Sequence, residues 1–182
     1  MKMIPVTVLT GFLGSGKTTL LSHLLRHPEM GRTAVIINEF GEMGLDHELV
    51  ETSEEDFVEL TTGCLCCRLR DDLVLTLHDL LARRRREEVT AFNQIVIETT
   101  GLADPAPILQ TLASDVALAE TLKLANVVTT VDALLGLETL TRFSESARQV
   151  AVADKLVLTK TDLVDDDGQR LLSNVRKLNP WA

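Results

Sequence analysis

The chain has 182 residues, of which 45% are hydrophobic and 25% are charged. This length fits one domain with a real core, because a chain of ~150 residues buries roughly two-thirds of its unfolded surface. Ten glycines, five prolines and three cysteines exclude collagen-like proteins and disulfide-framework proteins. The formal net charge of -9 argues against a nucleic-acid partner, because proteins that bind the phosphate backbone are usually basic.

The beginning of the chain lacks the pattern of a targeting segment. One basic residue precedes a short apolar run that Pro5 interrupts, and no small-residue cleavage site follows. No apolar stretch approaches the ~18 residues of a membrane span. We therefore expect a soluble, cytoplasmic protein without a membrane partner.

Apolar, β-branched runs alternate with amphipathic segments along the chain. The runs predict strands at residues 6–9, 33–37, 57–60, 94–98, 125–131 and 155–159. The amphipathic segments predict helices at residues 17–26, 70–87, 105–120, 133–141, 144–152 and 166–178. This alternation predicts a three-layer α/β fold, with a mostly parallel central sheet and helices on both faces. We expect residues 1–182 to form one domain of this kind.

A phosphate-binding motif follows the first predicted strand. Residues 11–18 read GFLGSGKT, which fits G-x-x-x-x-G-K-[ST] between a strand and a helix and predicts a P-loop NTPase. The loop N–H groups and the helix N-terminus would hold phosphates, Lys17 would reach the β- and γ-phosphates, and Thr18 would ligate Mg²⁺. The alternative is a glycine-rich turn that only caps a helix. The expected nucleotide ligands here are Gly11, Gly14, Ser15, Gly16, Lys17, Thr18 and Thr19.

An acidic residue closes the predicted strand at residues 94–98, and a glycine follows three residues later. Ligands of parallel sheets lie at the carboxyl ends of strands, so Glu98 is expected to hold a Mg²⁺-bound water. The N–H group of Gly101 would contact the γ-phosphate and respond to its loss. The alternative for Glu98 is a structural role beside a helix start.

A candidate base-reading element closes the last predicted strand. Residues 159–162 read TKTD, which is similar to the guanine-reading N-K-x-D element of GTPases. Asp162 would accept hydrogen bonds from guanine N1–H and the 2-amino group, and the Lys160 stem would lie across the base. Thr159 stands where the pattern has Asn, and a hydroxyl makes one of the bonds that an amide makes. The alternative is a charged strand-to-helix turn.

The three cysteines are Cys64, Cys66 and Cys67, which lie too close together to staple distant segments. Thiolates suit zinc or copper(I), and zinc takes four ligands. The fourth ligand must come from elsewhere in the chain, a partner or water, and an incomplete site suits reversible loading. The alternatives are buried core thiols, a redox pair or a structural zinc site. The candidate fourth ligands are Glu39, Glu42, His47 and Glu59.

The cysteines are expected in a loop at the same sheet edge as the phosphate loop. The segment between the two sites, residues 38–47, combines glycines with oxygen ligands and is the natural switch. Asp46 within it would ligate Mg²⁺ or orient the attacking water. The alternative is a solvated acidic loop.

The combination of these motifs resembles the CobW-type metallochaperone GTPases, relatives of HypB and UreG. The resemblance rests on residues 11–19, 38–42, 63–67, 98–105 and 159–162, in the order of the family. It implies a GTPase domain that uses Mg²⁺ and delivers zinc or cobalt to a client metalloprotein or a metal-insertion machinery, often with self-association. The family normally continues into a smaller C-terminal domain, and no such domain is expected within these residues.

No residue in the sequence identifies a catalytic glutamine or an arginine finger, so we expect slow hydrolysis that metal, a second copy or the client accelerates. Two other functions fit a P-loop. One is a small-molecule kinase, which would make phosphorylated products, and the other is a metal- and nucleotide-binding regulatory module without hydrolysis.

Overall fold

The structure is a computed structural model that describes residues 3–37, 57–59, 65–68, 73–166 and 168–182, with the backbone alone for residues 57–59 and 65–68. Its centre is a seven-stranded sheet in the order β3-β4-β2-β5-β1-β6-β7. The strands are β1 (Ile4–Gly11), β2 (Thr33–Ile37), β3 (Phe57–Glu59), β4 (Leu65–Arg68), β5 (Gln94–Glu98), β6 (Leu122–Asp132) and β7 (Lys155–Thr159). Only β3 among them runs antiparallel to its neighbour, so the mostly parallel sheet that the sequence predicts is confirmed.

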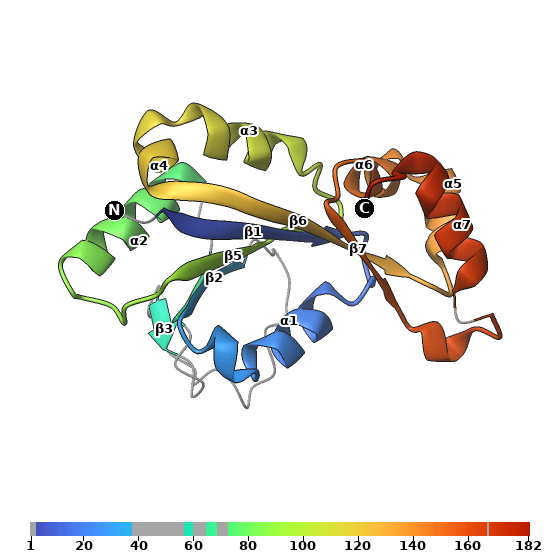
Figure 1. Cartoon of the computed structure of the whole chain (residues 1–182), viewed down its shortest axis with the longest axis horizontal. Helices are drawn as coiled ribbons and strands as arrows, with labels where there is room; N and C mark the ends of the chain where they lie inside the picture. The colour runs from blue at the N-terminus through green and yellow to red at the C-terminus, as the bar shows by residue number, and fades with distance from the viewer. Residues whose placement is uncertain (1–2, 38–56, 60–64, 69–72, 167) are drawn as a thin grey trace.

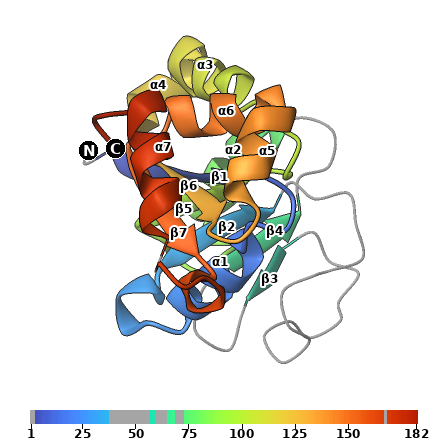
Figure 2. The same cartoon turned by 90° about the vertical axis from the view of Figure 1, so that its right-hand side faces the viewer.

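Helices cover both faces of this sheet, as Figures 1 and 2 show. They are α1 (Lys17–Leu25), α2 (Leu73–Arg85), α3 (Ala106–Ser114), α4 (Val116–Thr121), α5 (Gly136–Arg142), α6 (Ser144–Ala151) and α7 (Gln169–Leu178). Two short 3-10 helices, η1 (Pro28–Met30) and η2 (Thr161–Leu163), follow α1 and β7. None of the helices in the described part of the chain is long and apolar enough to cross a membrane.

Alternating strand residues bury the two faces against different helices. In β2, Ala34 and Ile36 pack with α2 and α4 residues such as Leu77 and Leu118. Val35, between them in sequence, packs with Leu21 of α1 on the opposite face. Successive side chains of a strand point to opposite faces, so a continuous apolar run is what a sheet covered on both sides requires. The three-layer architecture is therefore confirmed.

The predicted helix at residues 105–120 is two helices in the structure. Asp115 has an extended backbone, and its carboxylate accepts a hydrogen bond of 2.9 Å from the N–H of Leu118. This contact caps α4, because an aspartate side chain satisfies an N–H that the first turn of a helix leaves without a partner.

The position expected for the cysteines is wrong in one respect. Cys66 and Cys67 do not lie in a loop at the end of a strand but within β4 itself, which pairs with β2 in parallel and with β3 antiparallel. Cys66 is in register with Val35 and Cys67 with Ile36. Cysteine behaves as a small hydrophobic residue, so Leu-Cys-Cys suits an inner strand. The two residues lie level with the middle of β2.

Candidate nucleotide-binding site

The glycine-rich loop joins β1 to α1 at the carboxyl edge of the sheet. Gly11 ends β1 with φ +144°, and a Cβ atom there would lie 2.3 Å from the Thr130 hydroxyl. Gly16 precedes α1 with φ +86°, a left-handed conformation that glycine adopts without strain. Between them the N–H of Ser15 donates to the carbonyl of Phe12 at 3.0 Å, which closes the turn. The predicted strand–loop–helix arrangement is present.

Side chains from β6 and β7 hold this loop in place. The hydroxyls of Ser15 and Thr130 are 2.6 Å apart, and Thr159 donates its proton to the Ser15 carbonyl at 2.8 Å. Lys17 is 5% exposed, and its Nζ donates to the carbonyl of Phe12 at 3.4 Å. A buried ammonium beside the N-terminus of α1 is the electrostatic setting that binds phosphate. Thr19, also expected to contact nucleotide, is an exposed residue in the first turn of α1.

Thr18 and Glu98 meet at the base of the loop. The Thr18 hydroxyl donates to Oε1 of Glu98 at 2.7 Å, although 80 residues separate the two in sequence. Glu98 ends β5 and is fully buried. A hydroxyl and a carboxylate are hard oxygen donors of the type that Mg²⁺ prefers beside phosphates. The donor set therefore fits a magnesium ion.

The segment after β5 lies against the phosphate loop. A Cβ atom on Gly101 would be 2.7 Å from both the Cα and the backbone nitrogen of Leu13. On the other side, Nε2 of Gln149 donates to the carbonyls of Gly101 and Ala103 at 3.1 and 3.0 Å. Gly101 is thus held between the loop and α6. Sequence analysis missed Gln149, whose only signal is a polar residue on the inner side of an amphipathic helix.

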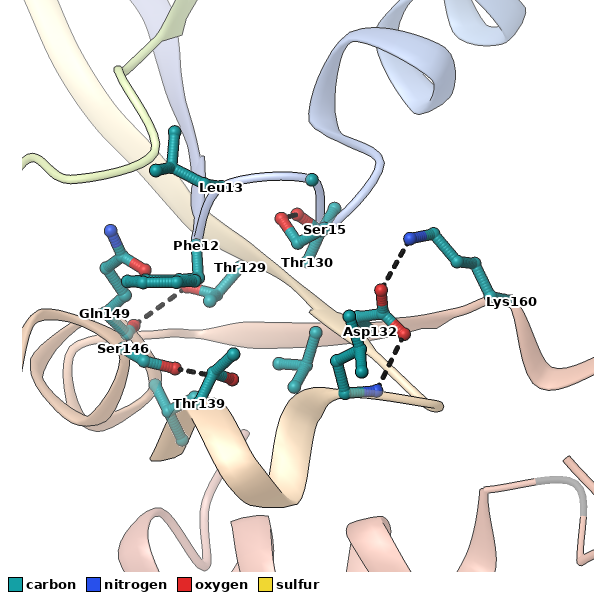
Figure 3. Close-up of a pocket in the computed structure, with 14 residues that line it drawn as sticks. Phe12, Leu13, Ser15, Thr129, Thr130, Asp132, Thr139, Ser146, Gln149 and Lys160 are labelled. Carbon is teal, nitrogen blue, oxygen red and sulfur yellow. Dashed lines mark hydrogen bonds and ion pairs between the residues drawn. The ribbon is translucent and has the colours of Figure 1, made fainter. Parts of the chain in front are cut away.

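The candidate base-reading residues follow β7. Lys160 has φ +56°, and its ammonium forms an ion pair with Asp132 at the end of β6 (Figure 3). Burial raises the pKa of Asp132, but hydrogen bonds from Lys160, Leu135 and Leu134 outweigh it and lower that pKa below its usual value. Asp162 is exposed in η2, where a ligand can reach it. Sequence analysis missed Asp132, which had no signal beyond its place at a strand end.

A cavity of about 70 Å³ lies beside the phosphate loop. Figure 3 shows Phe12 and Ser15 of the loop on one side and Ser146 and Gln149 of α6 on the other. Oε1 of Gln149 is buried and has no hydrogen-bond partner among the residues that the structure describes. Both apolar and polar side chains line the cavity, and residues 12–15 of the loop form part of its wall.

Several predicted site residues lie outside the described residues, namely Glu39, Glu42, Asp46, His47 and Cys64. For Cys66, Cys67 and Glu59 the structure gives the backbone of β4 and β3. Among the residues it describes with side chains, no group of three or more His, Cys, Asp or Glu can hold a metal ion. The thiol site stays a prediction.

The three-layer fold, the glycine-rich loop and the Thr18–Glu98 contact define the class of P-loop nucleotide-binding proteins. Within that class the chain belongs to the CobW/HypB/UreG family, whose nucleotide-binding domain matches residues 5–182. The family resemblance seen in the motifs is therefore confirmed.

The chain is similar to two curated proteins over almost its whole length. It is 41% identical to "Zinc chaperone YjiA" of Escherichia coli, over all of this chain and 57% of that protein. It is 38% identical to "Zinc-regulated GTPase metalloprotein activator 1" of Schizosaccharomyces pombe, over 98% of this chain and 44% of that protein. The chain thus spans about half the length of these relatives.

A solved structure agrees with the fold. The crystal structure of Zn(II)-bound YjiA GTPase from E. coli superposes with a TM-score of 0.81 and 39% sequence identity. The superposition covers 97% of this chain and 55% of the other. A zinc-bound variant of the same GTPase, in which one glutamate and two cysteines are replaced by alanine, superposes equally well.

Proposed function

We propose that this chain is the GTP-binding and GTP-hydrolysing domain of a metallochaperone. It loads zinc, or cobalt as the second choice, on a cysteine motif and passes the ion to a client metalloprotein or a metal-insertion machinery. The observation that carries the proposal is the contact of Thr18 with the buried Glu98 under a formed phosphate loop. The names of the relatives, a zinc chaperone and a zinc-regulated GTPase, support the metal part.

In this proposal the phosphate loop and β5 perform the hydrolysis. The loop N–H groups and Lys17 neutralise the phosphates, and the N–H of Gly101 meets the γ-phosphate. Thr18 would hold Mg²⁺ directly and Glu98 would hold it through water. Bound there, Mg²⁺ neutralises charge that develops on the phosphate oxygens. Asp46 is proposed to orient the attacking water or to add a further Mg²⁺ ligand.

Guanine selection is assigned to the residues after β7. Asp162 accepts protons from N1–H and the 2-amino group of guanine, and adenine lacks that pair of donors. The stem of Lys160 lies across the base while its ammonium stays with Asp132. The exposure of Asp162 and the fixed backbone of Lys160 support this assignment.

The metal is assigned to Cys64, Cys66 and Cys67, with Glu39 and Glu42 as further ligands. Thiolates favour zinc over magnesium, so the two ions occupy different sites. The β4 strand that carries Cys66 and Cys67 is separated from β5, which carries Glu98, by β2 alone. Two strand spacings are about 10 Å, too far for one ion to bridge both sites. Coupling must therefore pass through the chain between them.

Partners of the whole protein are part of the same proposal. We infer a client metalloprotein, self-association of the domain and a cytoplasmic location, where thiols stay reduced. The relatives are about twice as long as the chain, and client docking is assigned in part to the remainder of such a protein.

Phosphate release from GTP by the reduced chain, with and without zinc, tests the enzymatic part. We expect slow release that zinc changes and that Lys17→Ala abolishes. Lys155→Ala, a substitution of an exposed lysine on the edge strand, is the matched control and should behave as the unaltered chain. Unchanged release in Lys17→Ala would refute the catalytic assignment, and a phosphorylated small-molecule product in place of free phosphate would indicate a kinase.

Competitive zinc titration tests the chaperone part. We expect different zinc affinities with a non-hydrolysable GTP analogue and with GDP, and a large loss of affinity in Cys66→Ser with Cys67→Ser. Glu39→Gln and Glu42→Gln should each weaken zinc less than the thiol changes. Equal zinc affinities in the two nucleotide states would leave two independent sites and contradict a transfer switch.

A further inference from the structure

Thr159, the first residue of the base-reading element, is hydrogen-bonded to the phosphate loop. The Thr159 hydroxyl donates to the Ser15 carbonyl at 2.8 Å, and its second contact, to the Val131 carbonyl, is longer at 3.4 Å. Both neighbours are acceptors. A hydroxyl carries one proton, so the proton of Thr159 is engaged inside the protein.

Guanine presents two acceptors, N7 and O6, on the edge opposite its sugar-facing side. An acceptor on the base needs a donor on the protein. The oxygen of Thr159 has only lone pairs left, and two acceptors do not bond to each other. An asparagine amide at this position would carry two protons and could serve the loop carbonyl and N7 together.

The neighbouring lysine does not replace that donor. The ammonium of Lys160 is bound to the carboxylate of Asp132, whose lowered pKa keeps it ionised at neutral pH. The left-handed backbone of Lys160 fixes the direction in which its stem leaves β7. The side chains of Thr159 and Lys160 are therefore both bound within the protein, to the Ser15 carbonyl and to Asp132. Asp162 is left to recognise the base.

We propose that Thr159 makes nucleotide binding by this chain independent of guanine N7, so that selectivity rests on the N1–H and 2-amino edge. This inference depends on the proposed guanine-reading role of Lys160 and Asp162. It makes Thr159 a specificity-determining residue that joins the base reader to the phosphate loop without contacting the N7 edge.

Dissociation constants of GDP, 7-deaza-GDP and IDP test the inference without any substitution. The first analogue replaces N7 by a carbon, and the second lacks the 2-amino group. We expect the unaltered chain to bind GDP and 7-deaza-GDP within about twofold of each other, and IDP at least several-fold more weakly, because the Asp162 carboxylate then loses one of the two donors that guanine offers. A clear preference for GDP over 7-deaza-GDP would overturn the inference.

Thr159→Asn supplies the missing donor and should therefore gain recognition of N7. We expect this variant to prefer GDP over 7-deaza-GDP by about two- to tenfold, the worth of one net hydrogen bond. Thr161→Asn, two residues further along, is the matched control and should keep the ratio of the unaltered chain. The same preference in Thr161→Asn, or none in a folded Thr159→Asn, would contradict the role of position 159.

Different results would refute the base-reading assignment and the role of Thr159. If GDP and IDP bind equally, Asp162 does not read the 2-amino group, and the base-reading assignment falls together with this inference. If IDP binds weakly but 7-deaza-GDP is also rejected, guanine reading stands and only the role given to Thr159 is wrong.

Discussion

Replacing Gly101 by alanine should push the phosphate loop and the segment after β5 apart. The added Cβ would lie 2.7 Å from the Cα and the backbone nitrogen of Leu13, closer than such atoms approach in proteins. Both clashes involve backbone, so no side chain can rotate to relieve them. The backbone of residue 101 cannot easily shift away from the loop either, because Nε2 of Gln149 donates a hydrogen bond of 3.1 Å to the Gly101 carbonyl from the other side.

The expected loss of stability in Gly101→Ala follows from this close packing on both sides. Insertion of a methyl group into a packed site destabilises proteins by about 1–3 kcal/mol, and a site closed on two sides belongs at the upper end. For a chain of this size each kcal/mol lowers the melting temperature by about 2–4 °C. We therefore expect a decrease of roughly 4–10 °C in Gly101→Ala.

Scanning calorimetry of the chain without nucleotide and with a GTP analogue measures both the loss of stability and the loss of nucleotide binding. We expect the lower melting temperature together with weaker binding of a GTP analogue, because the loop amides that hold phosphate are displaced. Gly136→Ala is the control, since its Cβ would meet the flexible end of Leu171 of α7 at 2.9 Å and no atom of the loop. It should lose some stability and keep its nucleotide affinity. Normal stability and affinity in Gly101→Ala would refute the packing argument.

Three further outcomes are expected. Gln149→Leu removes the donor to one buried and one partly buried carbonyl and should cost about 1–3 kcal/mol in urea unfolding. Gln169→Leu on the exposed start of α7 is the unaffected control. The folded pKa of Asp132 is lowered, so its carboxylate stabilises the fold above about pH 4 and this contribution disappears as the pH falls through the lowered pKa. Asp132→Asn should therefore melt earlier at neutral pH and show a smaller stability loss on acidification, and equal pH profiles would contradict this. Thr159→Val removes the donor to Ser15 and should weaken GDP and 7-deaza-GDP by the same factor in a competition assay, whereas Thr159→Ser should restore both.

Features that depend on a local sequence pattern, namely several strands and the phosphate loop, could be predicted well from the sequence. The strands at residues 33–37, 94–98 and 155–159 have the predicted bounds, because each is a short apolar run closed by a polar residue or glycine. The phosphate loop was equally readable, since its spacing and its strand–helix context are both local. The edge of the sheet at which Glu98 and Gly101 lie then followed from the rule for parallel strands.

Pairing between distant segments was beyond the sequence. β4 was missed because Leu-Cys-Cys-Arg has four residues and its thiols indicated a metal loop more strongly than a strand. Gln149 and Asp132 were missed because their partners are 48 and 28 residues away. A polar residue on an amphipathic helix or at a strand end has many possible roles, and only the packed fold selects one of them.

The register of the sheet restricts how cargo and nucleotide can influence each other. Ile37, the last residue of β2, is level with Glu98 on one side and with Arg68, the residue after Cys67, on the other. β2 ends at Ile37 and β3 begins at Phe57, so in sequence residues 38–56 join the strand between the two sites to the strand that pairs with β4. This stretch contains the proposed ligands Glu39, Glu42 and Asp46. If a change of nucleotide moves the first residues of this stretch, the movement would be passed along the chain to β3 and β4. We therefore expect the nucleotide state to alter zinc affinity although the two ions share no ligand.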